Sequence, residues 1–197
     1  MSKRLKKELQ IMIDEKLGQI FLGDKKKNLR LLMLRPIDLI EFSEFAGTNA
    51  EDILVWVGKT LGKSVLEKFF YNKDWSKEKK ATKKEVFLGI LEALELMGYG
   101  HLTGAFKKTH VIVKVEDSLS VDEKENIMAK NLCILYQGVI SGILDALQID
   151  VDNEEIECVL LGHENCIFKF GFISEELEDD LVDADSGESV SDFLSNL

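Results

Sequence analysis

The stretch IECVLLGHENCIFKFGF, residues 156–172, decides the fold of this chain. Two apolar runs, residues 156–161 and 166–172, flank a short polar segment, which is the pattern of two antiparallel strands joined by a tight turn. Two of the three cysteines of the chain, Cys158 and Cys166, bracket this turn at a spacing of eight residues. A hairpin can place such a pair of side chains opposite each other. The stretch therefore predicts a terminal β-hairpin that carries two neighbouring thiols.

The rest of the sequence alternates between short apolar strands and amphipathic helices. Apolar spacing, capping residues and turn signals predict these elements: strands 20–22 and 29–34, helices 37–45, 49–70 and 82–97, strands 101–106 and 109–115, a helix that follows the capping box at 120–123 and ends at 147, and strands 156–161 and 166–172. A short amphipathic helix is also expected over residues 7–17. The pattern predicts an α+β fold, in which an antiparallel sheet of about four to six strands has helices packed on one face.

Local signals indicate where the helices begin and what approaches them. Asn49 is a good N-cap, and capping boxes begin at Thr82 and at Ser120. Gly58 and Gly62 lie one turn apart inside the helix that follows Asn49. Each glycine costs about 1 kcal/mol relative to alanine in a helix interior. We therefore expect another element to approach this helix closely at the two glycines.

Length and charge indicate one domain with an acidic tail. The chain has 197 residues, 45% of them apolar, which suffices for one substantial core but is cramped for two. The net charge of −11 is concentrated near the end, because no basic residue follows Lys169 and nine carboxylates lie after residue 174. We expect an N-terminal amphipathic segment (1–19), one domain (20–173) and an acidic, disordered tail (174–197). The nearly neutral body argues against nucleic-acid binding.

The sequence predicts a cytoplasmic protein that does not insert into a membrane. It has no uninterrupted apolar run near the ~20 residues that span a bilayer, and the N-terminus MSKRLKKELQ lacks the apolar core of a signal peptide. In a reducing compartment the three cysteines are not expected to form disulfides, and an odd number cannot all pair within one chain. Residues 190–197 of the tail can alternatively form a short partner-binding helix.

The three cysteines are candidates for a metal site. Cys133 lies on the helix before the closing hairpin, and if this helix packs across the hairpin, its sulfur completes a triangle with Cys158 and Cys166. Thiolates suit Zn²⁺, and a tetrahedral site with four protein ligands is closed to substrates. For the fourth ligand the spacing leaves open Glu154, which shares the strand parity of Cys158, and His163 in the turn. The alternative is that all three cysteines are small buried apolar residues.

From about residue 21 to residue 172 the sequence resembles the V4R (4-vinyl reductase) family. Members of this family are small-molecule-binding domains, related in fold to a vesicle-tethering subunit family and found as the sensor part of phenol-responsive bacterial activators. The matching motifs are GKTLG at 58–62, EDS at 116–118, EIEC at 155–158 and GHENCIF at 162–168.

The resemblance also implies a particular set of zinc ligands. In family members with zinc, the metal is held by a helix cysteine, an acid three residues before the next cysteine, that cysteine, and a cysteine eight residues later. The matching residues of this chain are Cys133, Glu155, Cys158 and Cys166. Glu155 and Cys158 have opposite parity in a regular strand, so both can reach one ion only if the chain bends or bulges between them.

The function implied by the resemblance is a zinc-containing sensor domain in a homodimer. We expect it to bind a small apolar or aromatic molecule between the sheet and the helices 49–70 and 82–97. Phenol itself is not expected, because the tryptophan that the resemblance predicts in the second hairpin of phenol sensors is absent from residues 109–115. The alternative is a homo- or hetero-oligomeric assembly subunit, as in the tethering relatives, with a vestigial pocket.

We expect no catalytic centre. His101, His110 and His163 are the only histidines, and no serine, cysteine or acid stands at a recognisable nucleophile spacing from them. Reduction of a vinyl group, which the family name suggests, is disfavoured because the chain shows no nucleotide or flavin signature and a closed zinc site offers no open coordination position.

Overall fold

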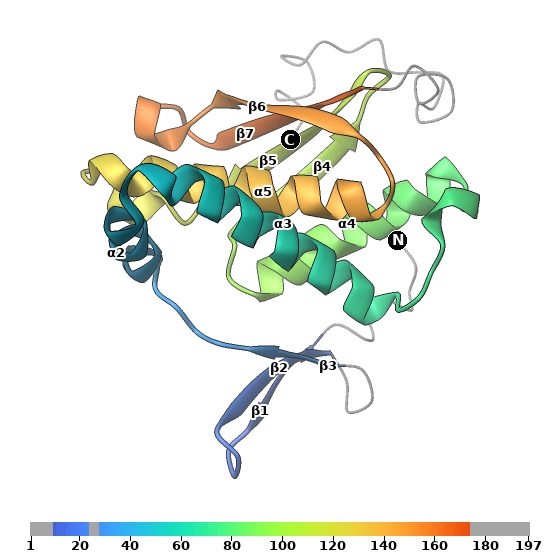
Figure 1. Ribbon diagram of the computed structural model, residues 1–197, viewed down its shortest axis with the longest axis horizontal. Helices are drawn as coiled ribbons and strands as arrows, with labels where there is room; N and C mark the ends of the chain where they lie inside the picture. Colours follow the sequence, from blue (N-terminus) through green and yellow to red (C-terminus); the bar gives the residue numbers. More distant parts are fainter. Residues whose placement is uncertain (1–9, 24–27, 174–197) are drawn as a thin grey trace.

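A four-stranded antiparallel sheet covered on one face by helices forms the body of the molecule (Figure 1). The computed structural model describes residues 10–23 and 28–173. The strand order is β4-β5-β7-β6, and the strands are β4 (His101–Phe106), β5 (His110–Glu116), β6 (Val151–Glu157) and β7 (Cys166–Phe172). The α-helices in the described residues are α2 (Pro36–Ala46), α3 (Ala50–Phe69), α4 (Lys80–Leu96) and α5 (Lys130–Ala146). The predicted α+β fold, with helices on one face of an antiparallel sheet, is confirmed.

Side-chain alternation along the strands creates the face that the helices cover. The strand residues that point toward the helices are apolar and buried: Leu102, Phe106, Val111, Val113, Val115, Phe168 and Phe170. They share one core with the inward sides of α4 and α5. Burying one large apolar side chain contributes about 1.5–3 kcal/mol, so this interface between sheet and helices contributes a substantial part of the apolar stabilisation.

Helices α3 and α5 cross at a contact made by four glycines. A Cβ atom added at Gly58 would lie 2.7 Å from the carbonyl oxygen of Leu135 on α5. The same approach of backbone to backbone occurs at Gly62, and reciprocally at Gly138 and Gly142 of α5. Real Cβ atoms essentially never come within 3.0 Å of another heavy atom. The close approach predicted at the two glycines of α3 is therefore confirmed, and its partner is α5.

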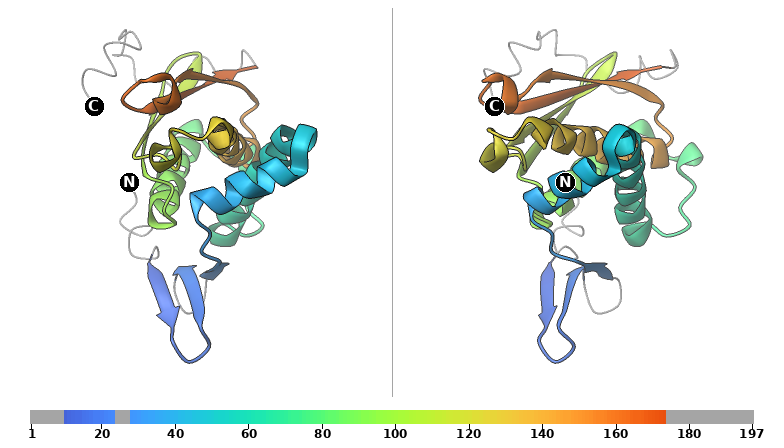
Figure 2. Two further views of the ribbon diagram at one scale, coloured as in Figure 1. Left: turned by 90° about the vertical axis from the view of Figure 1, so that its left-hand side faces the viewer. Right: turned by 60° about the vertical axis from the view of Figure 1, so that its left-hand side comes forward.

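The N-terminal strands form a second, separate sheet that extends away from the body (Figure 2). Its order is β1-β2-β3, with β1 at Ile11–Asp14, β2 at Gln19–Gly23 and β3 at Asn28–Leu31. The hairpin predicted from residues 20–22 and 29–34 is confirmed as β2 and β3, but β3 ends at Leu31, so residues 32–34 are not part of the strand. Part of the loop between the strands lies outside the described residues. Leu22 is fully buried and joins this ribbon to the main core.

The helix predicted over residues 7–17 is wrong where the structure describes it. Residues Ile11–Asp14 form β1 and pair antiparallel with β2. The carboxylate of Asp14 accepts hydrogen bonds from two N–H groups of the following turn, at 3.0 and 3.1 Å, and Gly18 adopts a φ of 60°. This turn reverses the chain and brings the segment alongside β2. A segment this short does not form a stable helix alone, so it pairs as a strand although its apolar residues have helical spacing. Residues 7–9 lie outside the described part of the chain.

Some of the helix starts predicted from capping residues differ from the observed ones. Asn49 occupies the N-cap position of α3, but its side chain makes no capping hydrogen bond. α4 begins at Lys80, ahead of the capping box predicted at Thr82. The residues after Ser120 form two short 3₁₀ turns, and α5 begins only at Lys130. The hydroxyl of Ser120 contacts a cysteine sulfur instead of a helix N–H group, which is why this capping box fails.

The segment Ile127–Ala146, which contains α5, is long and apolar enough to cross a membrane by length and composition. However, 72% of its apolar window is buried inside the fold. Its position as the central helix of the core accounts for its composition. The tail that the sequence predicts to be disordered, residues 174–197, lies outside the described residues.

Candidate metal centre

Three thiols and one carboxyl group converge at one end of the sheet. Cys133 lies in the first turn of α5, Cys158 directly follows β6, and Cys166 is the first residue of β7. Their sulfurs and a carboxylate oxygen of Glu155 all lie within 4.8 Å of one another. The Sγ atoms of Cys133 and Cys158 are 3.6 Å apart. Two thiolates bound to one tetrahedral zinc ion, each at about 2.3 Å, lie roughly 3.8 Å apart, so the spacing of the donors fits such an ion.

A β-bulge brings Glu155 and Cys158 to the same ion-sized space. Glu155 pairs with Phe168 of β7 and Glu157 pairs with Ile167, so the register shifts between the two acids. In a regular strand, residues three apart point to opposite faces. The extra residue of the bulge turns the chain locally, so the side chains of Glu155 and Cys158 can point to the same side of the sheet. The bend required by the predicted ligand set is therefore present.

The turn after Cys158 differs from the strand predicted over residues 156–161. Residues Val159–Leu161 form a 3₁₀ turn, and the carbonyl oxygen of Cys158 accepts a hydrogen bond from the N–H group of Leu161 at 3.0 Å. Gly162 closes the turn with a φ of 91°, a conformation that glycine adopts at no steric cost. The apolar residues that suggested a strand instead form this turn, so the chain reverses close to the sulfurs.

Glu155 carries a buried oxygen that has no hydrogen-bond partner. Its Oε1 atom is inaccessible to solvent and makes no hydrogen bond. Leaving a buried polar oxygen unpaired is costly, and the cost is larger still for an ionised carboxylate. A cation among the three neighbouring sulfurs would satisfy this oxygen. This atom is the observation that most directly supports a metal ion at this position.

Two serine hydroxyls lie next to the sulfurs. The Oγ atom of Ser118 is 3.6 Å from the sulfur of Cys166, and that of Ser120 is 3.6 Å from the sulfur of Cys133. Both serines are buried. A hydroxyl that donates to a thiolate stabilises its negative charge and orients it, as outer-shell partners do in metal sites. The spacing of the cysteines gave no indication of these contacts, because Ser120 reads as a helix cap in the sequence.

The protonation of the metal-free thiols differs among the three cysteines. A hydrogen bond from Cys133 lowers the pKa of Cys166 to about 7. Burial raises the pKa of Cys158 to about 12. The pKa of Cys133 is also raised, first by its hydrogen bond to Cys166 and then by burial. A metal ion must therefore displace protons from Cys133 and Cys158, so its affinity must fall as the pH falls.

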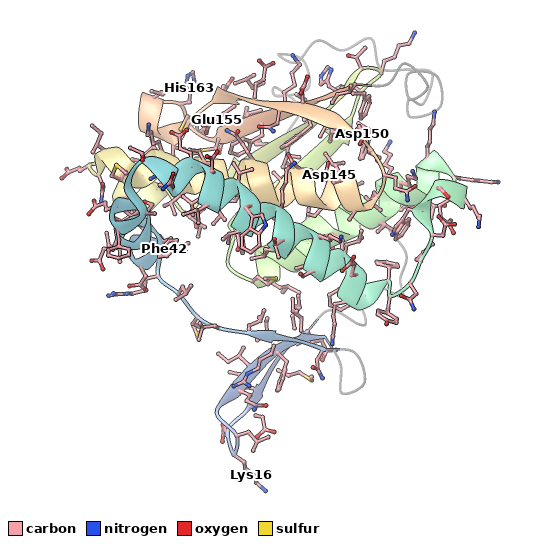
Figure 3. All side chains as sticks on the ribbon, viewed as in Figure 1. Lys16, Phe42, Asp145, Asp150, Glu155 and His163 are labelled. Atoms are coloured by element: carbon pink, nitrogen blue, oxygen red, sulfur yellow. The ribbon has the colours of Figure 1, made fainter. Side chains whose placement is uncertain are left out.

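The alternative fourth ligands, Glu154 and His163, do not join the sulfurs. Glu154 points to the other face of the sheet, where its carboxylate accepts a hydrogen bond from Lys169 at 2.7 Å and its side chain is 57% exposed. His163 is 48% exposed, and its Nδ1 lies 3.9 Å from Glu157. Figure 3 shows Glu155 and His163 at the same end of the sheet. Of these candidates, only Glu155 lies with the three sulfurs.

A row of aromatic rings leads from the cysteines into the core. Tyr136, which follows Cys133 by one turn on α5, stacks on Phe168 with the ring centroids 5.9 Å apart. On its other side Tyr136 meets Tyr99 edge-on, also at 5.9 Å. The hydroxyl of Tyr136 donates to the carbonyl oxygen of Tyr99 at 2.6 Å and accepts from the N–H group of Leu119 at 3.1 Å. The cysteine cluster and the aromatic row thus share one continuous interior.

Two hollows among the described residues are open surface features. One, of about 800 Å³, is lined by residues 121–127. The other, of about 360 Å³, is lined by Glu95, Gly98, Gly100, His101 and Asp117. Neither lies between the sheet and the helices, where the sequence places a ligand. In this conformation, side chains such as those of the aromatic row occupy that interior.

The fold matches that of a solved sensory domain. The phenol-responsive sensory domain of the transcription activator PoxR, solved with phenol, matches with a TM-score of 0.63 and 19% identity, over 90% of this chain and 92% of that chain. This chain has the fold of that sensory domain. An H-NOX protein from S. oneidensis in the Fe(II)NO ligation state matches with a TM-score of 0.51 and 11% identity, over 77% of this chain and 84% of that chain.

A trafficking protein particle complex subunit 3 from Naegleria fowleri also matches, with 16% identity over 70% of this chain and 96% of that chain, but its TM-score of 0.42 is too low to support an argument. No family model and no curated protein matches the sequence. The likeness to the PoxR domain confirms, for the fold, the resemblance carried by the sequence motifs. At 19% identity it concerns the fold alone.

Proposed function

We propose that Cys133, Glu155, Cys158 and Cys166 hold one structural zinc ion. The unpaired buried oxygen of Glu155 beside three sulfurs is the observation that carries this proposal. Three thiolates and one carboxylate complete a tetrahedron, which leaves no coordination position for a substrate. The ion fastens β6, the turn after it and the start of β7 to α5, because Glu155 lies in β6, Cys158 directly follows it, and the other two cysteines lie on β7 and α5.

The fourth ligand can be tested with a matched pair of neighbours. Glu155→Gln is expected to weaken zinc binding by about 100-fold or more, since even outer-shell substitutions cost 10- to 100-fold. Glu154→Gln, the control, is expected to leave zinc affinity unchanged because this residue lies on the other face of the sheet. Competition with a chromophoric chelator measures both affinities. Equal affinities of the two variants would contradict the assignment of Glu155.

We further propose that the domain is a sensor-type module that binds a small apolar or aromatic molecule. Its fold is that of a phenol-responsive sensory domain over nine-tenths of the chain. The row of Tyr99, Tyr136 and Phe168 beside the metal centre offers stacking surfaces, and the Tyr136 hydroxyl offers one polar anchor. Because side chains fill this interior in the present conformation, the ligand enters by displacing side chains between the sheet and the helices α4 and α5; α3, against which the sequence also placed the ligand, packs on α5 instead.

Ligand binding can be tested although the ligand is unidentified. The purified protein is extracted and the extract analysed by mass spectrometry, and phenol, benzoate and indole are titrated in thermal-shift assays against cyclohexanol as the non-aromatic control. A ligand at 100 times its Kd is expected to stabilise the protein by about 2.7 kcal/mol, which corresponds to about 5–11 °C for a domain of this size. A protein that carries no bound molecule and shows no shift with any compound would refute the sensor proposal.

The second candidate function is an assembly subunit, and exposed apolar residues favour it. Large apolar side chains are solvent-exposed on the N-terminal ribbon, on the segment after it and on α2, with Phe45 92% exposed: Ile13, Leu17, Leu32, Met33, Leu34 and Phe45. Such groups of side chains often mark interfaces between proteins. A homodimer through this surface is compatible with both candidates. Light scattering tests whether the protein is a dimer through this surface. The native chain is expected to be a dimer, and Leu32→Ser combined with Phe45→Ser is expected to convert it into a monomer.

The proposal includes no catalytic centre and places the protein in the cytoplasm. A closed metal site does not activate a substrate, which argues against vinyl reduction by this domain. Three reduced cysteines that serve as metal ligands fit a reducing compartment. His101 is engaged with Glu95 at 2.8 Å, and His110 with the Thr109 hydroxyl at 2.9 Å.

A further inference from the structure

Residues 118–120, which we call the strap, follow β5 and contact the metal centre at both ends. The Oγ atom of Ser118 lies 3.6 Å from the sulfur of Cys166, and that of Ser120 lies 3.6 Å from the sulfur of Cys133. A zinc-bound sulfur is a thiolate, and a hydrogen bond to an ionised acceptor is about twice as strong as one between neutral groups. Both ends of the strap are therefore held most firmly when the centre carries its metal.

The middle residue of the strap is bound to Tyr136. The N–H group of Leu119 donates to the Tyr136 hydroxyl at 3.1 Å. Tyr136 follows Cys133 by three positions on α5, so the two side chains lie on the same face of this helix. A phenol hydroxyl can donate one hydrogen bond while it accepts another. The strap therefore leaves the hydrogen of this hydroxyl free for a second partner.

The second partner of the Tyr136 hydroxyl is the backbone at the end of α4. The hydroxyl donates to the carbonyl oxygen of Tyr99 at 2.6 Å. The N–H group of Tyr99 in turn donates to the carbonyl oxygen of Leu94, in the last turn of α4, at 3.1 Å. A row of polar contacts thus runs from two sulfurs of the metal centre, through the strap and the Tyr136 hydroxyl, to the C-terminal end of α4.

The end of α4 matters because this helix covers the interior in which we place the ligand. Its inward residues pack in the core between helices and sheet: Val86, Phe87, Ile90, Leu91 and Leu94. Hydrogen bonds that share one hydroxyl strengthen one another. Weakening the bond from Leu119 to the Tyr136 hydroxyl therefore also weakens the bond from this hydroxyl to Tyr99.

We propose that Tyr136 is a positioning residue that couples the metal centre to the C-terminal end of α4. In the metal-bound protein the strap is fixed, and the N–H group of Leu119 orients the Tyr136 hydroxyl toward Tyr99. In the metal-free protein the strap is held less firmly, and the end of α4 opens more often. This inference rests on the zinc centre proposed above, and it makes metal occupancy a control on the helix that covers the ligand interior.

Amide hydrogen exchange of the full-length chain, measured by NMR with zinc and after its removal by a chelator, tests this coupling. The N–H groups of residues 97–99 bond to the last turn of α4, and that of Val121 bonds to Ser118 of the strap. In the native chain, chelation is expected to speed exchange at both places by about 5-fold, which corresponds to the loss of one hydrogen bond. In Tyr136→Phe, Val121 is expected to respond as before, whereas residues 97–99 exchange fast already with zinc and no longer respond to chelation.

Tyr99→Phe is the matched control. It removes a phenol hydroxyl one ring away and keeps the main-chain oxygen that accepts from Tyr136. Its exchange and its zinc affinity are expected to equal those of the native chain. Because coupling acts equally in both directions, Tyr136→Phe is expected to lower zinc affinity by about 5-fold. Competition with a chromophoric chelator measures this affinity, which a purely structural role of the hydroxyl would leave unchanged.

The coupling and the zinc centre fail in distinguishable ways. Chelation that speeds exchange at Val121 of the native chain but not at residues 97–99 would overturn the coupling and leave the zinc centre intact. A native protein without zinc would overturn both. If Tyr136→Phe does not fold, as circular dichroism would reveal, Ser120→Ala takes its place, because it frees one end of the strap. Residues 97–99 of zinc-bound Ser120→Ala are then expected to exchange faster than in the native chain, and an unchanged rate would contradict the coupling.

Discussion

Replacing Cys166 by serine is expected to abolish stoichiometric zinc binding and to lower the melting temperature by about 10 °C. A serine hydroxyl is not deprotonated as a thiolate is, so the ion would lose one of three sulfur ligands. Structural zinc contributes apparent free energies of about 10–16 kcal/mol in peptides that fold only around the ion. This domain has a large core of its own, so we expect a loss of about 4 kcal/mol, and each kcal/mol corresponds to about 2–4 °C. Metal analysis and calorimetry measure the two effects.

The control for this experiment is His163→Ala, in the turn that precedes Cys166. Its side chain is half-exposed and lies apart from the sulfurs, so both zinc content and melting temperature are expected to stay unchanged. The competing interpretation holds that the cysteines are small apolar core residues. It predicts no zinc in the native protein, and a Cys166→Ala variant nearly as stable as the native chain. A metal-free native protein would therefore decide against the zinc centre.

Gly62→Ala is expected to destabilise the domain by about 3 kcal/mol, which lowers the melting temperature by about 6–12 °C. The new methyl group would collide with the backbone of Val139 on α5, and backbone cannot move aside as a flexible side chain can. Overpacking typically costs about 1–3 kcal/mol, and a collision with backbone lies at the upper end. Alanine also gains about 1 kcal/mol of helix propensity over glycine, so a net loss shows that the collision dominates. Chemical denaturation measures the free energy of unfolding.

Thr60→Ala, on the exposed side of the same helix, is the matched control. Thr60 lies two residues before Gly62 and is solvent-exposed, so its replacement is expected to change stability by no more than about 0.5 kcal/mol. If Gly62→Ala stabilised the protein as helix propensity alone requires, the close crossing of α3 and α5 would be contradicted. Zinc content is expected to remain stoichiometric in both variants, because the crossing and the metal centre use different faces of α5.

Elements with strong periodicity could be predicted from the sequence, and weakly patterned ones could not. The helices α3 and α5 carry long apolar stripes, and the glycines of α3 correctly indicated a close neighbour. Residues 11–14 failed because a short segment with helical spacing becomes a strand once an Asp14 turn and a partner strand are available. The capping box at Ser120 failed because its hydroxyl is used by Cys133. Local signals do not reveal such tertiary partners.

The candidate centre could be predicted in its sulfurs but not in its surroundings. The eight-residue spacing of Cys158 and Cys166 and a cysteine on the preceding helix indicated convergence, and the four donor atoms do lie together. Glu155 followed only from the family resemblance, because strand parity argued for Glu154. A single extra residue at the bulge reverses that parity, and no residue type in the segment marks a bulge.

The position of β7 has a consequence for how the protein is made. Although β7 is the last strand in the described part of the chain, it lies in the interior of the sheet, between β5 and β6. During vectorial synthesis both of these neighbours must wait with unpaired edges until residues 166–172 emerge. Nascent chains at that stage are therefore most exposed to mispairing with one another. Insertion of this strand, which also delivers Cys166, closes the sheet and completes the ligand set in one event.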